Sequence, residues 1–295
     1  MSRAFSPRQR TGSHLAGRVA IVTGASRGIG AAIARRFAAE GAKVALVART
    51  LEPHDQLAGS LSEVTRSIQE MGGICCPIQA DLTRTGDLAS IVERTERAFG
   101  SADILVNNAA WARFPPIWEA TPRQVELAFQ MNLTAPHLLS QLVYPAMRNK
   151  GEGWILNITT ASADVPPPAP WNFDERYFQY QRDGHASLYG ASKAALDRLT
   201  AGWAIELSGS GVAVNALAPV GAVASEGALA LSGWNEEDHL EPVEAMAEAA
   251  LQLCWRPAAE CSGEIARSLP LIRRLGVAIR QLDGKTLLGS EEAKI

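Results

Sequence analysis

A tyrosine and a lysine lie four positions apart near the middle of the sequence, in the run Tyr189-Gly190-Ala191-Ser192-Lys193. Residues at this spacing share one face of a helix, so the phenol of Tyr189 and the ammonium of Lys193 come close together. A free tyrosine has a pKa of about 10, and a nearby positive charge lowers that pKa. The pair therefore predicts a general acid or base at Tyr189, assisted by Lys193. The same spacing, taken alone, also fits an ordinary surface pair.

A second candidate site is the glycine-rich run at Thr23–Gly30. It follows an apolar run typical of a strand and precedes residues with helical spacing, where backbone N–H groups and a helix dipole bind a pyrophosphate. The glycines also fit a purely structural turn, but their setting favours a dinucleotide site. The expected cofactor contacts in this run are Gly24, Ser26, Arg27, Gly28, Ile29 and Gly30.

Two arginines predict which dinucleotide binds. Sites that prefer NAD usually place Asp or Glu about 20 residues past the glycines, where the carboxylate accepts from the ribose 2′-OH. Here Ala48 and Arg49 stand at that point. Arg49 and Arg27 are planar cations that suit a 2′-phosphate, so the sequence favours NADP(H). NAD(H) is the alternative if both arginines are only solvated surface charges.

The apolar pattern predicts a regular framework that positions these groups. An apolar run at 18–24, helical spacing through Ile29, Ile33 and Phe37, and a second apolar run at 43–49 form a βαβ unit. The alternation then continues. Further strands are expected at 104–106, 154–158, 212–216 and 269–272, and helices at 60–71, 84–99, 121–148, 188–208 and 242–255. The predicted fold is α/β, a doubly wound parallel sheet of Rossmann type.

Composition excludes several classes of protein. The chain has 295 residues, 47% hydrophobic and 20% charged, as in ordinary globular proteins. A net charge of −3 gives no positive excess for nucleic acid. No run of about 18 apolar residues is present to span a membrane. The four cysteines lack zinc-binding spacing, so we expect no metal and reduced thiols in a cytoplasmic protein.

The domain organisation is expected to be simple, because no linker, charge block or internal repeat divides the chain. We expect a flexible tail at 1–16, one domain at 17–289 and a loose end at 290–295. The segment 163–187, called the insert below, breaks the pattern with prolines and clustered aromatic residues. It is interpreted either as a lid that shapes the substrate pocket or as a subunit contact or surface flap.

Together these features resemble the short-chain dehydrogenases/reductases, in the compact single-domain branch of that family, over about Gly17 to Gly263. The resemblance implies reversible hydride transfer between a nicotinamide and a carbonyl or alcohol substrate, without metal and in a homo-oligomer, a dimer or a tetramer. The motifs that carry it are the glycine turn, Asp81-Leu82, Asn107-Asn108-Ala109-Ala110, Asn132, Asn157–Thr160, Tyr189–Lys193 and Asn215–Pro219.

The resemblance also implies residue roles. Tyr189 is expected to protonate the carbonyl oxygen, Lys193 to hold the nicotinamide ribose and lower the tyrosine pKa, and Asn132 to position a water. Thr160 is the expected hydroxyl donor, with Ser162 as the alternative because residues two apart on an extended strand share a face. The remaining implied cofactor contacts are Asp81, Leu82, Asn108, Ala109, Pro219 and Val223.

This sequence departs from the family pattern in four ways. Thr160 stands where serine is usual, and an unusually long segment separates it from Tyr189. Ala110 replaces a glycine, and the nicotinamide-end run Pro219–Ser225 carries an extra residue. Ser225 is expected to offer a hydroxyl in that run.

The predicted function is that of an NADP(H)-dependent oxidoreductase acting on a neutral or weakly polar carbonyl or alcohol. The alternative is an NADP(H)-binding regulator or oligomeric scaffold with weak or lost turnover, which the departures motivate. The presence of both Tyr189 and Lys193 favours the enzyme. The aromatic candidates for lining the substrate pocket are Trp111, Phe114, Trp171, Phe173 and Trp203.

Overall fold

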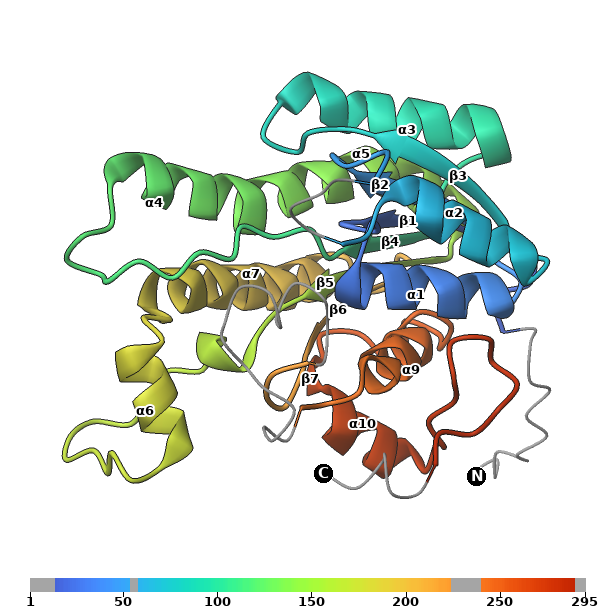
Figure 1. The fold of residues 1–295 in the computed structure, drawn as a ribbon. Helices are drawn as coiled ribbons and strands as arrows, with labels where there is room; N and C mark the ends of the chain where they lie inside the picture. Colours follow the sequence, from blue (N-terminus) through green and yellow to red (C-terminus); the bar gives the residue numbers. More distant parts are fainter. Residues whose placement is uncertain (1–13, 54–57, 224–239, 290–295) are drawn as a thin grey trace.

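The centre of the molecule is a parallel sheet of seven strands in the order β3-β2-β1-β4-β5-β6-β7 (Figure 1). The computed structural model describes residues 14–53, 58–223 and 240–289. The strands are β1 Val19–Thr23, β2 Lys43–Ala48, β3 Ile74–Gln79, β4 Ile104–Asn107, β5 Gly153–Ile158, β6 Val212–Ala218 and β7 Ile265–Arg267. The order reverses between β1 and β4, which is where doubly wound folds bind their ligands. The predicted fold class is confirmed.

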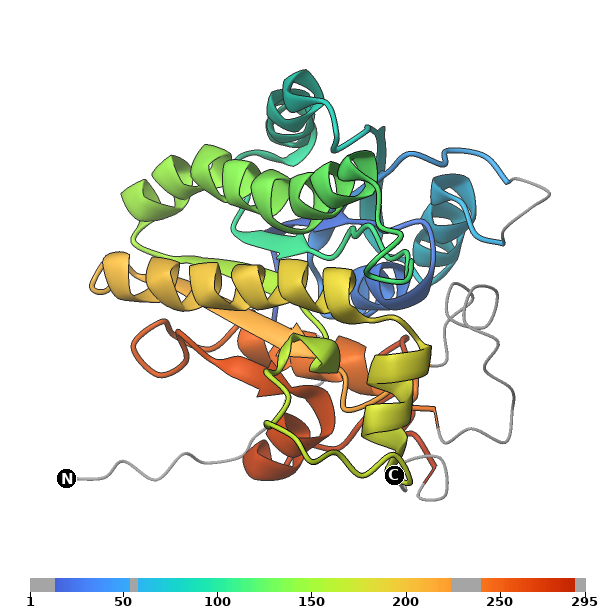
Figure 2. The same cartoon turned by 90° about the vertical axis from the view of Figure 1, so that its left-hand side faces the viewer.

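Helices cover both faces of the sheet (Figures 1 and 2). One face carries α1 Gly28–Ala39, α2 Leu61–Glu70, α9 Val243–Leu253 and α10 Ser268–Leu275. The other face carries α3 Thr85–Phe99, α5 Ala135–Lys150 and α7 Ser187–Glu206. Within the described residues, no helix combines the length and the apolar character needed to cross a membrane.

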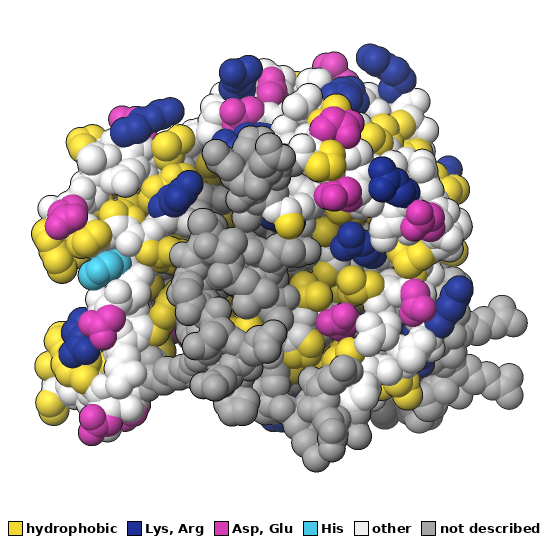
Figure 3. Space-filling model, in the orientation of Figure 1, with side chains coloured by type: hydrophobic (Ala, Val, Ile, Leu, Met, Phe, Trp, Pro, Cys, Tyr) yellow, Lys and Arg dark blue, Asp and Glu magenta, His cyan; other side chains and the backbone are white. Residues whose placement is uncertain are grey.

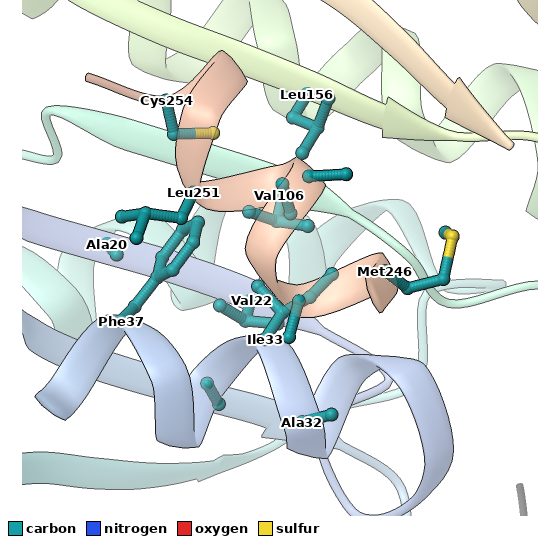
Figure 4. Close-up of a cluster of buried hydrophobic side chains, with 14 of the residues drawn as sticks. Ala20, Val22, Ala32, Ile33, Phe37, Val106, Leu156, Met246, Leu251 and Cys254 are labelled. Carbon is teal, nitrogen blue, oxygen red and sulfur yellow. The ribbon is translucent and has the colours of Figure 1, made fainter. Parts of the chain in front are cut away.

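The hydrophobic core lies in two layers because successive strand residues face opposite sides of the sheet. Ala20 and Val22 of β1 face α1 and α9, whereas Ile21 belongs to the layer under α3 and α5. Figure 4 shows Phe37 of α1 and Leu251 of α9 packed over β1. Burial on both faces holds the strand ends, and the loops that follow them, in fixed positions.

The predicted strand at 269–272 is wrong. Strand β7 ends at Arg267, and the next residues form α10. Leu271 and Ile272 are buried while Arg273 and Arg274 are exposed, which is the pattern of a helix with one apolar face. Pro270 lies in the first turn, where its missing N–H breaks no helical hydrogen bond.

The insert contains a short helix, α6 Arg176–Asp183, which sequence reasoning did not predict. It extends from the body of the molecule near the start of α7 (Figures 1 and 2). Within the insert, the Trp171 indole donates to the carbonyl of Pro167, and the Arg182 guanidinium lies 4.4 Å from the Phe173 ring centre. Hydrophobic side chains gather over this region and over the loop before α4 (Figure 3).

Candidate active site

A cleft of about 270 Å³ opens where β1, β2, β3 and β4 end. Its position is the topological switch point of the sheet, the usual place for a dinucleotide. Seven of the predicted cofactor contacts line it: Gly24, Ser26, Arg27, Arg49, Leu82, Asn108 and Ala109. The lining residues that sequence reasoning did not assign are Val47, Ala48, Thr50, Ala80, Ala110 and Met131. Most of these residues are next to a predicted site residue in the sequence, and that adjacency is the feature from which they could have been predicted.

The glycine turn is built by close backbone contact. Gly24 and Gly28 have φ values of 67° and 56°, which favour glycine. A Cβ on Gly30 would lie 2.4 Å from both the Gly24 carbonyl oxygen and Asn108 Nδ2. Asn108 Nδ2 in turn donates to Thr23 O at 2.9 Å. Because Gly24, Gly28 and Gly30 carry no side chains, a ligand can approach the backbone of this turn at the start of α1. The turn therefore fits a pyrophosphate.

The two arginines, Arg27 and Arg49, both line the cleft. Arg27 donates from Nε to Ala58 O (2.7 Å) and from Nη2 to Gly59 O (2.8 Å), which leaves further N–H groups for an anion. Burial opposes ionisation of Asp81, but hydrogen bonds from Thr83 and the charge of Arg49 hold the pKa of Asp81 below its usual value. Asp81 thus remains a carboxylate close to Arg49.

Asn132 joins two walls of the site. The predicted helix over 121–148 is divided into α4 Pro122–Phe129, a π-helical turn at Gln130–Thr134 and α5, and Asn132 is buried in that turn. Its Oδ1 accepts from Trp111 N at 2.8 Å, and its Nδ2 donates to Ser192 Oγ at 2.9 Å. The π turn therefore aims one side chain at both the loop after β4 and helix α7.

Lys193 is buried on α7, and its Nζ donates to Ile158 O at 2.7 Å. Burial lowers the pKa of Lys193 to about 8, against the opposing effect of the Asp197 carboxylate. Burial also raises the pKa of Tyr189, helped by the charges of Tyr180 and Asp197. Desolvation thus dominates at Tyr189, and the lowering of its pKa by Lys193 stays a prediction. A phenol with a raised pKa is protonated at neutral pH.

The two hydroxyl candidates have different partners. Thr160 caps a 3-10 turn, η2 Ala161–Ala163, where Ser162 N donates to Thr160 Oγ1 at 3.3 Å. That bond leaves the Thr160 hydroxyl hydrogen available for donation. Burial raises the pKa of Tyr180 on the insert helix α6, and the Ser162 side chain opposes that rise. A Cβ on Gly190 would lie 2.4 Å from Ser162 O, so η2 sits directly against the helix that carries Tyr189.

The run after β6 is held by a residue that sequence reasoning did not assign. Val220 N donates to Glu241 Oε2 and Glu241 N donates to Ala222 O, each at 2.8 Å. Val223 pairs with Glu241 in an isolated parallel bridge, and both residues are buried. Pro219 and Val223 lie in this loop, and their contact with the cofactor stays a prediction, whereas Ser225 lies outside the described residues. No local pattern connects Glu241 with this loop.

Comparison with known proteins identifies the family. The family model described as short chain dehydrogenase matches residues 18–171. Hydroxysteroid dehydrogenase-like protein 2 of Mus musculus is 31% identical over 243 residues, which are 82% of this chain and 46% of that protein. The chain therefore spans about half the length of this curated relative.

Two solved structures are similar in fold as well as sequence. A 7α-hydroxysteroid dehydrogenase complexed with NADH and 7-oxo glycochenodeoxycholic acid has a TM-score of 0.71 and 29% identity, covering 86% of this chain and 93% of that one. A metagenomic short-chain oxidoreductase in complex with NADP has a TM-score of 0.68 and 30% identity, covering 86% and 98%. The chain belongs to the short-chain dehydrogenase/reductase family, whose members are oxidoreductases acting on hydroxyl and carbonyl groups.

Proposed function

We propose that this protein is an NADP(H)-dependent reductase of a neutral or weakly polar carbonyl compound, with the reverse oxidation open to the same site. The observation that carries the proposal is the placement of Tyr189 and Lys193 on one face of α7, beside η2 and Thr160. The nicotinamide supplies the hydride when it is bound.

In this proposal Tyr189 holds the proton that the carbonyl oxygen takes up, and Thr160 donates a hydrogen bond to the same oxygen. The raised pKa keeps Tyr189 protonated before the reaction. Lys193 binds the ribose hydroxyls. Asn132 fixes the position of α7 relative to the loop after β4, because it is hydrogen-bonded to Ser192 on the helix and to Trp111 in the loop. Positioned proton transfer of this kind contributes about 10²- to 10⁴-fold to the rate.

The preference for NADP(H) is supported by Arg27 and Arg49 at the rim of the cleft and by Ala48 where NAD sites carry an acidic residue. Asp81, Leu82, Asn108 and Ala109 are proposed to contact the adenosine side of the cofactor. The proposed nicotinamide contacts are backbone groups of Pro219 and Val223. Gly28, Ile29 and Gly30 are proposed to face the pyrophosphate from the start of α1.

The proposal is tested by loss of NADPH absorbance with a panel of ketones, aldehydes and quinones. We expect turnover that falls by about 10²- to 10⁴-fold in Tyr189→Phe while NADPH affinity is unchanged. Tyr144→Phe, which removes the same hydroxyl from a ring packed on Trp203, serves as the matched control. NADPH binding without any turnover would favour the regulator instead.

We also infer a cytoplasmic homo-oligomer organised as one domain over 17–289. Exposed apolar side chains on α5 and α7, Leu142 and Ile205, support association through these helices. Sedimentation of the wild type beside Leu142→Glu tests this inference. An unchanged sedimentation coefficient would exclude α5 from the interface.

A further inference from the structure

Glu241 contacts the loop after β6 with both its side chain and its backbone. Residues 219–223 are called the β6 loop below. The Oε2 atom of Glu241 accepts from Val220 N, and Glu241 N donates to Ala222 O, each at 2.8 Å. Glu241 is 2% exposed, so its carboxyl oxygen is shielded from water and the hydrogen bond is strengthened. Two backbone groups of the loop are therefore held by one buried residue from a distant part of the chain.

The β6 loop leaves the sheet beside the anchor of Lys193. Lys193 Nζ donates to Ile158 O at 2.7 Å, and Ile158 of β5 is paired with Leu217 of β6. Thr159 N also donates to Leu217 O at 2.8 Å. The chain passes from Leu217 through one further residue of β6 into Pro219. The loop that Glu241 holds thus starts next to the lysine that is proposed to bind the nicotinamide ribose.

Glu241 also fixes the direction of two other backbone groups of the loop. The peptide bonds before Val220 and before Val223 are trans, and the C=O and N–H of a trans peptide point in opposite directions. Because the Val220 N–H points at Glu241, the Pro219 carbonyl points away from it. Because the Ala222 carbonyl points at Glu241, the Val223 N–H points away from it. The loop therefore turns one acceptor and one donor away from Glu241.

One acceptor and one donor complement a primary carboxamide, which has N–H donors and a carbonyl acceptor. We propose that Glu241 is a positioning residue for the nicotinamide end of NADP(H), because it directs the Pro219 carbonyl and the Val223 N–H toward the carboxamide of the ring. This inference rests on the proposed function, in which Pro219 and Val223 contact the nicotinamide. It adds the residue that holds these two contacts in place.

A purely structural role for Glu241 makes a different prediction. If its carboxyl group only stabilises the fold, removing it weakens every ligand of the cleft alike. If the carboxyl group positions the nicotinamide end, removing it weakens only ligands that carry a nicotinamide. The two roles are therefore separated by comparing the affinities of a whole cofactor and of its adenosine part.

The experiment measures the dissociation constants of NADP⁺ and of 2′,5′-ADP, which has the adenosine and the 2′-phosphate but no nicotinamide. We expect Glu241→Ala to bind NADP⁺ about tenfold more weakly than the wild type, the value of one hydrogen bond to a carboxylate, and 2′,5′-ADP equally well. Glu244→Ala removes the same group from a half-buried position in the first turn of α9 and leaves both constants unchanged. An equal loss for both ligands in Glu241→Ala, or no loss for either, overturns the proposal.

A second variant tests the hydrogen bond itself. Glu241→Gln keeps an oxygen that accepts from Val220 N, so we expect its NADP⁺ affinity to stay within about threefold of the wild type. A loss as large as that of Glu241→Ala would show that this acceptor does not position the loop, which overturns the inference.

A third readout uses the wild-type protein and does not depend on turnover. Isotope-labelled valine gives amide NMR signals, and Val223→Ile assigns the one that matters. We expect NADP⁺ to shift the Val223 signal and 2′,5′-ADP to leave it in place, because only NADP⁺ carries the carboxamide. A Val223 signal that NADP⁺ does not move overturns the inference. Turnover that persists in Tyr189→Phe overturns the proposed function instead.

Discussion

The turn after β1 and the segment after β5 both place polar groups at the carboxyl edge of the sheet, but they use different atoms. Around β1 the groups belong to the backbone of Gly24 and Gly30, held by Thr23 and Asn108. After β5 they are the side chains of Thr160, Ser162 and Tyr180, drawn from η2 and α6. The proposed cofactor side is thus built from backbone groups of one turn, which Asn108 holds from the loop after β4, and the proposed substrate side from side chains of η2 and α6.

The same steric change made on each side should therefore produce different defects. On the substrate side, a Cβ at Gly190 would lie 2.4 Å from Ser162 O, so Gly190→Ala displaces η2. We expect kcat to fall about 100-fold with NADPH affinity retained, because a small misplacement of reacting groups is costly. Steady-state kinetics and fluorescence titration measure the two effects. Gly202→Ala, which meets only the flexible end of Arg198, is the control on the same helix.

On the cofactor side, Gly30→Ala introduces an equally close contact with Gly24 O. We expect NADPH binding to weaken about 30-fold, equivalent to about 2 kcal/mol of overpacking. Gly86→Ala is the control, because a Cβ at Gly86 meets nothing within 4 Å. If Gly30→Ala lowered kcat at saturating NADPH and left the affinity intact, the division of the molecule into these two sides would fail.

The positive charge of Arg49 at the rim of the cleft is expected to distinguish NADPH from NADH. We expect Arg49→Ala to weaken NADPH binding about tenfold and to leave NADH binding unchanged, because only NADPH carries the 2′-phosphate. Titration of each variant with both cofactors measures this. Arg66→Ala removes an equal charge from an exposed position on α2 and serves as the control. Equal losses for NADPH and NADH would remove the case for a phosphate contact.

The smallest expected effect is a shift in the pH dependence of NADPH binding, which Lys193 and Asp197 control. Lys193 has a pKa of about 8, so its ammonium is lost, and NADPH binding weakens, as the pH rises through that value. The Asp197 carboxylate raises this pKa, so Asp197→Asn moves the loss to lower pH. We expect affinity about two- to threefold below wild type near pH 8.

At low pH the Asp197→Asn variant and the wild type should bind NADPH alike. Burial raises the pKa of Asp197 to about 6, so the wild-type carboxyl is itself neutral below that pH. Titrations across this range, with Glu70→Gln on the exposed end of α2 as control, measure the difference. A constant difference at all pH values would show that Asp197 acts on packing and not on the charge of Lys193.

The predictability of each element follows from how local its cause is. Apolar runs in the sequence predict strands β1 and β2. The spacing of the glycines predicts the turn, because only glycine fits its close backbone contacts. The strand expected at 269–272 failed because a short apolar run does not distinguish a strand from a buried helix face. Helix α6 was not predicted because the prolines before it dominate the local pattern.

By itself, the sequence determined the doubly wound sheet, the glycine turn at its switch point and the shared helical face of Tyr189 and Lys193. All three follow from repeating or short-range patterns in the sequence, which do not depend on how the chain packs. Only the tertiary structure brought Glu241 to Val220. It also buries Tyr189, which raises the pKa of that phenol. Burial and long-range contact arise from packing, so no spacing in the sequence contains them.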